Sequence, residues 1–516
     1  MNKNLFQPAL LALLLLLTRH PVAAFDLETA TIAEIQAAMD QDDLTAESLT
    51  HFYLDRIEAF DKQGPRINAV ITLNDHALQT ARALDKERKA KGPRGPLHGI
   101  PVVLKDNIDT FDLPTTGGCS LLAGSIPPDD AFIVKRLREA GAIILFKANM
   151  AEFASSGGAP EGFSSMGGQT RNPYDPTRGP SGSSGGPGAA LAAAFAQTGL
   201  GTDTSSSVRA PCSVNGLAGL RPTLGLISRD GIIPLSLSFD TAGPMARHIY
   251  DVAVTLDAIA GVDPADEETA KAAQHTPQSY TRFLKPGTLK GARIGVARAY
   301  MGQDQGTDRV IEWSLLKLKQ LGAEVIDPIE FPRLAVQSRS AVYHIVRHTD
   351  FPLQINDYLA TLKPGFPKTL RELIAQAENP ENGYNSPWKI EDYKEELEMP
   401  GYDNPVYRAG HDLGREMVRM SMQAVFDEKK LDAIIYPTQP FPAVKIDAEK
   451  RNKEDALTFG AVAGFPEVVV PAGMTNDGLP VTLSFLGTAF RDAELLGYAY
   501  DFEQATKAYK LPDSTP

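Results

Sequence analysis

The sequence is short of cysteine and of clustered positive charge. Only 2 of its 516 residues are Cys, which excludes a small scaffold held together by disulfides. Lys and Arg total 51 against 64 Asp and Glu, so the formal net charge is −13. No block of Lys and Arg interrupts this acidic balance, and such a chain is a poor candidate for binding nucleic acid or an anionic membrane surface. Glycine has no fixed period, which excludes a collagen-like chain.

Long apolar runs are equally scarce, and the most prominent lies near the start of the chain. Lys3 precedes the apolar run Ala9–Leu17, which is too short for a membrane span of about 20 residues. The small residues Val22-Ala23-Ala24 then predict cleavage after Ala24. We therefore expect residues 1–24 to be a signal peptide, and the mature protein to be periplasmic or secreted without a stable membrane span. A retained amino-terminal anchor is the alternative.

Export would affect the two cysteines. In an oxidising compartment Cys119 and Cys212 could form a disulfide, whereas two free buried thiols fit the sequence equally well. The sequence does not decide between these states.

Apolar residues are plentiful, at 43%, which excludes a disordered chain. A helical pattern over 132–140 leads through Gly141 into the buried run 142–146, and 309–321 leads into 324–326 in the same way. Further short apolar runs lie at 100–104, 434–436 and 468–470. Continuous apolar strands between helices indicate a sheet covered on both faces. The predicted fold class is α/β, with a large mixed, mostly parallel twisted sheet and helices on both faces.

Two stretches depart from this pattern. Residues 150–250 are rich in Gly, Ser and Pro, and residues 335–430 are helical with scattered aromatic side chains. No linker separates these two stretches, and the sequence contains no internal repeat. We therefore expect a single domain over 25–516 with a helical insertion at about 335–430, which either lines a substrate pocket or packs as ordinary helices.

Three polar clusters carry the candidate chemistry. Lys105 directly follows an apolar strand, residues 179–186 read GPSGSSGG, and residues 201–209 read GTDTSSSVR. Each alone has an ordinary interpretation as a solvated lysine, a flexible linker or a polar turn. Together they offer a serine nucleophile, an amine base whose pKa burial would lower, and backbone N–H groups for an oxyanion.

In this order the clusters resemble the motifs of the amidase signature family. Further motifs of that family follow in sequence, including residues 97–101, 114–118, 219–223 and 464–466, so the resemblance extends from about residue 96 to 502. It implies the amidase signature fold and an enzyme that hydrolyses linear amide C–N bonds, with side activity on carbamates or esters. It implies no cofactor and no metal, and a small amide molecule as the partner. The sequence leaves open whether the protein is a homodimer.

The resemblance also assigns roles to residues. Ser207 matches the nucleophile, Ser183 matches the bridging acid and base that follows a cis peptide bond, and Lys105 matches the base. The oxyanion hole would consist of the backbone N–H groups of Thr204, Ser205, Ser206 and Ser207, and the supporting residues would be Asp203, Arg209 and Ser184.

The sequence departs from the family at Ser205 and Ser206, where glycine or another small residue is usual. A serine would be strained if the backbone there required a positive φ. The sequence does not decide how these two serines affect the fine geometry of the oxyanion hole.

The sequence also fits other functions. Residues 182–186 fit the nucleophile elbow of an α/β-hydrolase esterase with Ser184 as nucleophile, but the preceding residues are turn-like and the last histidine, His411, is far from the end. A catalytically silent binding protein on the amidase fold is a second alternative. One component of a glutamine-dependent tRNA amidotransferase shares the motifs, and the predicted export argues against it. His344 and His348 have the spacing of a metal-binding pair but lack a third ligand, so surface or packed histidines are favoured.

Overall fold

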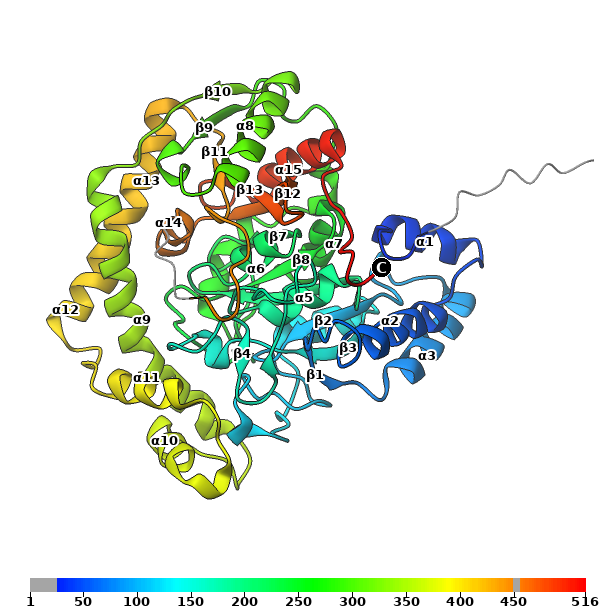
Figure 1. The fold of residues 1–516 in the computed structure, drawn as a ribbon, viewed down its shortest axis with the longest axis vertical. Coiled ribbons are helices and arrows are strands. Elements are labelled where there is room, and N and C mark those ends of the chain that lie inside the picture. The colour runs from blue at the N-terminus through cyan, green and yellow to red at the C-terminus, as the bar shows by residue number, and fades with distance from the viewer. Residues whose placement is uncertain (1–25, 449–454) are drawn as a thin grey trace, which may run out of the picture.

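The computed structural model describes residues 26–448 and 455–516 (Figure 1). The predicted signal peptide lies outside these residues. In the described part of the chain, no helix is both long enough and apolar enough to cross a lipid bilayer.

Eleven of the described strands form one sheet, in the order β1–β3–β2–β6–β8–β7–β12–β13–β11–β9–β10. Their bounds are β1 (Val70–Leu73), β2 (Pro101–Lys105), β3 (Ile143–Ala148), β6 (Thr198–Asp203), β7 (Ala218–Arg221), β8 (Thr241–Ala246), β9 (Arg293–Val296), β10 (Glu324–Ile326), β11 (Ala433–Pro437), β12 (Glu467–Met474) and β13 (Pro480–Leu486). A separate antiparallel pair consists of β4 (Phe163–Ser164) and β5 (Gly168–Gln169).

The sheet is large and mixed, as predicted, but it is not mostly parallel. Only β3–β2–β6 and β11–β9–β10 run parallel, and all other neighbours are antiparallel. A short turn joins β12 to β13, which forces an antiparallel pair, because a parallel pair needs a long crossover. Short apolar runs show that a strand is buried but not its direction, so this part of the prediction was wrong.

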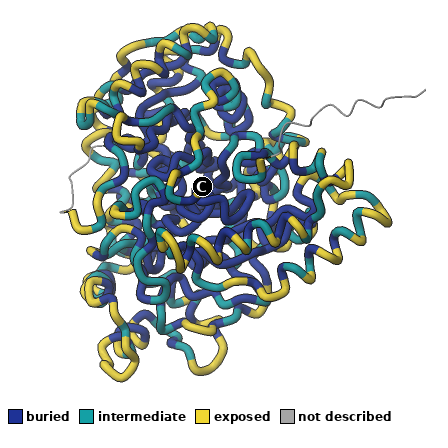
Figure 2. The backbone as a smooth tube through the Cα atoms, turned by 45° about the vertical axis from the view of Figure 1, so that its right-hand side comes forward, coloured by how far each residue is buried: buried dark blue, intermediate teal, exposed yellow. Residues whose placement is uncertain are grey.

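Helices pack against the sheet. Their bounds are α1 (Ile32–Asp40), α2 (Ala46–Phe60), α3 (Ala77–Lys91), α4 (Phe132–Glu139), α5 (Gly185–Ala192), α6 (Arg209–Val214), α7 (Ile249–Ile259), α8 (Gln305–Gln320), α14 (Leu457–Ala463) and α15 (Asp492–Thr506). Helices α3, α4 and α5 contact β3, α7 contacts β6 to β8, and α8 and α15 contact β12. The strands are therefore buried inside while exposed residues collect on the outer helices and loops (Figure 2).

The chain between β10 and β11 is helical and consists of α9 (Arg333–Thr361), α10 (Leu370–Glu378), α11 (Pro387–Leu397), α12 (Pro405–Arg408) and α13 (Arg415–Lys429). These helices lie along one side of the molecule (Figure 1). Phe351 of α9 and Tyr393 of α11 pack around Phe153, which follows β3. The helical segment is thereby fixed to the loop that follows β3. The division into one domain with an insertion stays a prediction.

Candidate active site

Lys105 lies at the carboxyl end of β2 and is completely buried. Its Nζ lies 2.7 Å from Ser183 Oγ, 2.8 Å from Thr202 Oγ1 and 3.3 Å from the Thr202 carbonyl oxygen. Burial lowers the pKa of Lys105 to about 7, although Asp203 and Asp240 favour the charged form. A large fraction of the amine is therefore neutral near pH 7, and its lone pair can accept a proton from the Ser183 hydroxyl at this distance.

Ser183 belongs to the loop that leads into α5, and the Gly182–Ser183 peptide bond is cis, as the resemblance implied. The loop after β3 holds this segment, because Ala151 N–H donates to the Ser183 carbonyl at 3.0 Å. Gly186 N–H donates to the Asn149 carbonyl at 2.9 Å. A Cβ on Gly186 would lie 2.0 Å from that carbonyl oxygen, so only glycine permits this close approach.

Ser207 lies in the loop between β6 and α6, beside the Ser183 loop. The Ser184 N–H donates to the Ser207 carbonyl at 3.2 Å. Ser183 and Ser207 line the same cavity of about 270 Å³. Lys105 and Ser183 are thus hydrogen-bonded, but Ser183 and Ser207 are not. Within residues 26–448 and 455–516, the Ser207 hydroxyl has no hydrogen-bond partner, which leaves it available to a bound substrate.

The loop from Thr204 to Ser207 contains the backbone N–H groups that were predicted to form an oxyanion hole. Among the described residues, no acceptor takes a hydrogen bond from any of its four backbone N–H groups. Ser205 and Ser206 line the cavity together with Ser207. Neither Ser205 nor Ser206 has a positive φ, so the strain considered for these two serines does not arise. The departure from glycine is compatible with four free N–H donors.

A buried charge network holds this loop. Asp203 accepts from Arg209 Nη2 at 3.0 Å, from Arg221 Nη1 at 2.8 Å and from Val208 N–H at 3.0 Å. Burial alone would raise the pKa of Asp203, but the two guanidinium groups outweigh it and hold the pKa below its usual range. Arg209 also forms an ion pair with Glu467 of β12. The predicted supporting pair, Asp203 and Arg209, is therefore present within a larger network.

The sequence analysis did not identify four residues that contact the site or its charge network. Thr202 and Arg221 lie inside motifs that the resemblance covers, so a signal for them existed. Asp240 accepts a hydrogen bond from Thr204 Oγ1 at 2.5 Å, and Glu467 pairs with Arg209, but nothing in the sequence connects these two carboxylates with the site.

Ser184, the nucleophile of the elbow alternative, does not line the cavity. It is completely buried, and its Oγ donates to the Thr202 carbonyl at 3.2 Å and accepts from the Thr202 N–H at 3.3 Å. The segment that precedes it is a loop rather than a strand. These contacts suit a residue that orients the loop.

Helix α9 contributes Tyr343, Arg347 and His348 to the cavity wall. Arg347 forms a buried ion pair with Glu396 of α11. Burial lowers the pKa of His348 to about 3, and the nearby Arg347 charge acts in the same direction, so its imidazole is neutral at pH 7. The rings of His344 and His348 stack with their centroids 4.1 Å apart. The described residues contain no group of three or more side chains suited to hold a metal ion.

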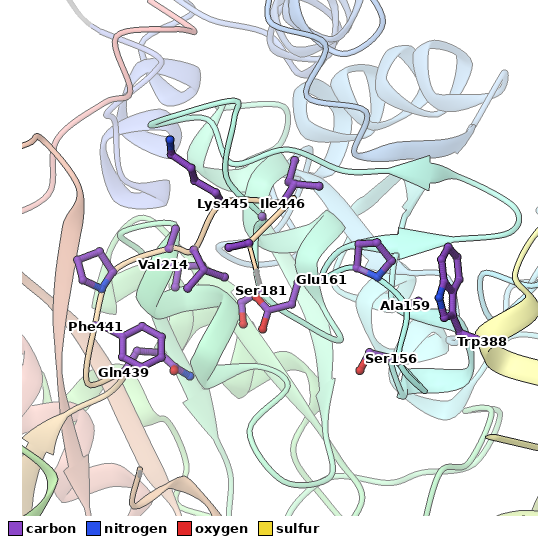
Figure 3. A pocket seen from close by; sticks show the side chains of 17 residues that line it. Ser156, Ala159, Glu161, Ser181, Val214, Trp388, Gln439, Phe441, Lys445 and Ile446 are labelled. Atoms are coloured by element: carbon purple, nitrogen blue, oxygen red, sulfur yellow. The ribbon is translucent and has the colours of Figure 1, made fainter. Parts of the chain in front are cut away.

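A second cavity of about 430 Å³ adjoins the first (Figure 3). The two share Ser156, Glu161 and Ser181. We refer to this second cavity as the outer cavity and to the first, which contains Ser183 and Ser207, as the catalytic cavity. Trp388 of α11 lines the outer cavity. Residues of the helical segment thus line both cavities, which agrees with the pocket interpretation of the aromatic insertion.

The two cysteines are free. Cys119 and Cys212 are both completely buried, and they lie in different hydrophobic clusters. Burial raises the pKa of both thiols well above the usual value.

The chain is similar to known proteins over most of its length. The sequence profile of the amidase family matches residues 48–496. A probable amidase of Arabidopsis thaliana is 35% identical, over 95% of this chain and 92% of the relative. A glutamyl-tRNA(Gln) amidotransferase subunit from Thermoanaerobacter pseudethanolicus is 34% identical, over 95% of this chain and 99% of that relative. The solved structure of peptide amidase from Stenotrophomonas maltophilia superimposes with a TM-score of 0.88 at 38% identity, over 94% of this chain and 98% of that one.

Proposed function

Because the chain belongs to the amidase family of amide-hydrolysing enzymes, we propose that it cleaves a linear amide through an acyl-enzyme on Ser207. Ser183 acts as the bridging acid and base, and Lys105 is the base. The observation that carries this proposal is the 2.7 Å contact of Lys105 Nζ with Ser183 Oγ, in a site whose cavity also contains Ser207.

The proposed reaction begins with neutral Lys105. It takes a proton from Ser183, which takes one from Ser207, and Ser207 Oγ attacks the amide carbon. The free N–H groups of residues 204–207 receive the oxyanion, an effect worth about 3–4 kcal/mol per donor. Ser183 then protonates the departing nitrogen and regains a proton from Lys105, and the C–N bond breaks to release ammonia or an amine. Water hydrolyses the acyl-enzyme through the same groups, and carbamates or esters can enter the same path.

We propose that the acyl part of the substrate extends from the catalytic cavity into the outer cavity. The outer cavity offers about 430 Å³ beyond the catalytic cavity, more than a short aliphatic amide fills. The similarity to peptide amidase supports amides of amino acids or peptides over the other amides considered.

We further propose that residues 1–24 direct export and that the mature enzyme begins at Phe25. An exported enzyme would not meet cytosolic tRNA, which favours a separate hydrolase over a component of an amidotransferase. Mass spectrometry of the amino terminus, on protein recovered outside the cytoplasm, tests this: a start at Phe25 supports export, and an intact Met1 contradicts it.

The mechanism is tested by trapping the intermediate. We expect release of ammonia from primary amides, together with an acyl adduct on the peptide that contains Ser207 in acid-quenched samples. Ser207→Ala should lose both signals, whereas Ser184→Ala should keep the adduct. An adduct on Ser184, or turnover that persists in Ser207→Ala, would overturn the proposal.

A further inference from the structure

The two cavities meet at one place. Ser156, Glu161 and Ser181 line both the catalytic cavity and the outer cavity. An acyl chain that is attached at Ser207 and extends into the outer cavity must pass these three residues. Whatever they recognise therefore lies close to the scissile carbonyl.

The outer cavity is lined mainly by apolar side chains. They include Val214, Trp388, Phe441, Val444 and Ile446. Trp388 is held in place edge-on against Phe163, with ring centroids 6.0 Å apart. Such a wall favours an apolar tail on the substrate.

Glu161 is the one carboxylate among the described residues that line these cavities. It is exposed, and the described residues provide no hydrogen bond or ion pair to its carboxylate. In the catalytic cavity the charge of Arg347 is balanced by Glu396, and His348 is neutral at pH 7. Counted over the described lining residues, Glu161 therefore gives this cavity a net negative charge.

Among the described residues, one positively charged side chain lines the outer cavity, that of Lys445. Figure 3 shows the ammonium end of Lys445 directed away from Glu161, whose carboxylate lies beside Ser181 in the middle of the lining residues. Within the part of the chain that the structure describes, no positive charge thus neutralises the carboxylate of Glu161 at the junction.

We propose that Glu161 is a specificity-determining residue that binds an ammonium group on the acyl part of the substrate, between the scissile carbonyl and an apolar tail. The substrate class is then the amide of an amino acid with an unblocked amino group and an apolar side chain. This inference rests on the proposed function and specifies its substrate.

The test compares two amides with one carbon skeleton. Leucinamide carries the α-ammonium group, and 4-methylpentanamide lacks it. At pH 7 most of the α-amino group is protonated, because its reference pKa is about 7.7–8.0. We expect the wild-type enzyme to favour leucinamide in kcat/KM by about fivefold, at the upper end of what a solvent-accessible ion pair provides.

Glu161→Gln should reduce this ratio to near 1, mainly by raising KM for leucinamide, and Glu161→Asp should keep part of it. Glu381 is an exposed glutamate outside both cavities, so Glu381→Gln is the matched control and should keep the ratio. A ratio that Glu161→Gln leaves unchanged, or a wild-type preference for 4-methylpentanamide, would overturn the inference.

Failure of the inference and failure of the proposed function give different results. If neither amide is hydrolysed but Ser207 still reacts with a fluorophosphonate, the cleft rejects the predicted class and the inference is wrong. If Ser207 does not react either, the proposed function fails as well.

Discussion

At the scale of single residues, two of the buried lysines, Lys105 and Lys147, have different surroundings. Lys147 Nζ donates to the Ile108 carbonyl at 2.6 Å and lies 3.7 Å from the carboxylate of Asp106. Lys105 contacts only hydroxyl groups and a carbonyl oxygen. Burial lowers the pKa of both amines, but only Lys147 has a carboxylate within ion-pair distance. Lys147 therefore suits a structural role, and Lys105 suits proton transfer.

The pH dependence of the reaction follows from Lys105. Because the neutral amine is the active form, kcat/KM should rise with pH along a limb with an apparent pKa near 7, and it should level off above that value. Lys105→Ala should lower kcat/KM by about 10²- to 10⁴-fold. The measurement is a pH–rate profile of both proteins with one amide. A wild-type profile that is flat between pH 6 and 8, or that falls with rising pH, would contradict this assignment.

The triad residues were predictable because they lie in motifs, and their partners were not. Lys105, Ser183 and Ser207 could be identified through the family resemblance. Glu467 lies 258 positions after Arg209 and is an ordinary carboxylate in sequence terms. Only the fold brings these two side chains together.

At the scale of elements, the loop between β6 and α6 depends on its buried charges. Arg209→Met would leave two carboxylates, Asp203 and Glu467, without this guanidinium partner in the interior. Removing one member of a buried ion pair costs about 3–5 kcal/mol, so the free energy of unfolding should fall by that amount. Urea unfolding at pH 7 measures it. Arg419→Met, which removes a half-exposed partner of Glu416, is the control and should cost less than about 1 kcal/mol. Equal losses of unfolding free energy in the two variants would contradict a stabilising role for the buried charge network around Arg209.

The contact between α5 and the loop after β3 depends on a glycine. In Gly186→Ala the new Cβ would lie 2.0 Å from the Asn149 carbonyl oxygen, and backbone cannot yield as a flexible side chain can. We expect a loss of more than about 3 kcal/mol in unfolding free energy, or failure to fold, because overpacking of this degree exceeds the usual 1–3 kcal/mol. A thermal melt of Gly186→Ala against Gly95→Ala checks it, since a Cβ on Gly95 has nothing within 4 Å. A Gly186→Ala melt like that of Gly95→Ala would show the contact to be loose.

Glycine also explains why the apolar pattern of the sequence did not reveal strand β6. Strand β6 reads TGLGTD and is buried throughout, yet it lacks the apolar run that identified β2 and β3. A Cβ on Gly199 would lie 2.3 Å from the Val103 side chain. Close packing replaces side-chain hydrophobicity in this strand, so apolar patterning could not detect it.

At the scale of the whole molecule, the mixed sheet gathers residues that are distant in sequence. Strand β2 ends at Lys105, its neighbour β6 ends at Asp203, and the loop into α5 lies beside both. The α/β class was predictable from alternating helices and apolar runs. Strand direction and order were not, because they depend on pairings across the whole chain.

The fold also sets the state of the thiols. Cys119 and Cys212 are free, buried and in separate clusters, so neither should react with a thiol reagent while the protein is native. For protein prepared without reductant, we expect no reaction with dithionitrobenzoate in the native state and two reactive thiols per chain in guanidinium chloride. Absence of reaction in both states would indicate a disulfide.

The most direct test of the account is to label the nucleophile. The protein is treated with a fluorophosphonate, and the modified serine is located by peptide mass spectrometry. The account predicts one modification, on Ser207, that is lost in Lys105→Ala and retained in Ser184→Ala. A modification on Ser184, or one on Ser207 that is undiminished when Lys105 is absent, would contradict the central claim that Lys105 activates Ser207 through Ser183.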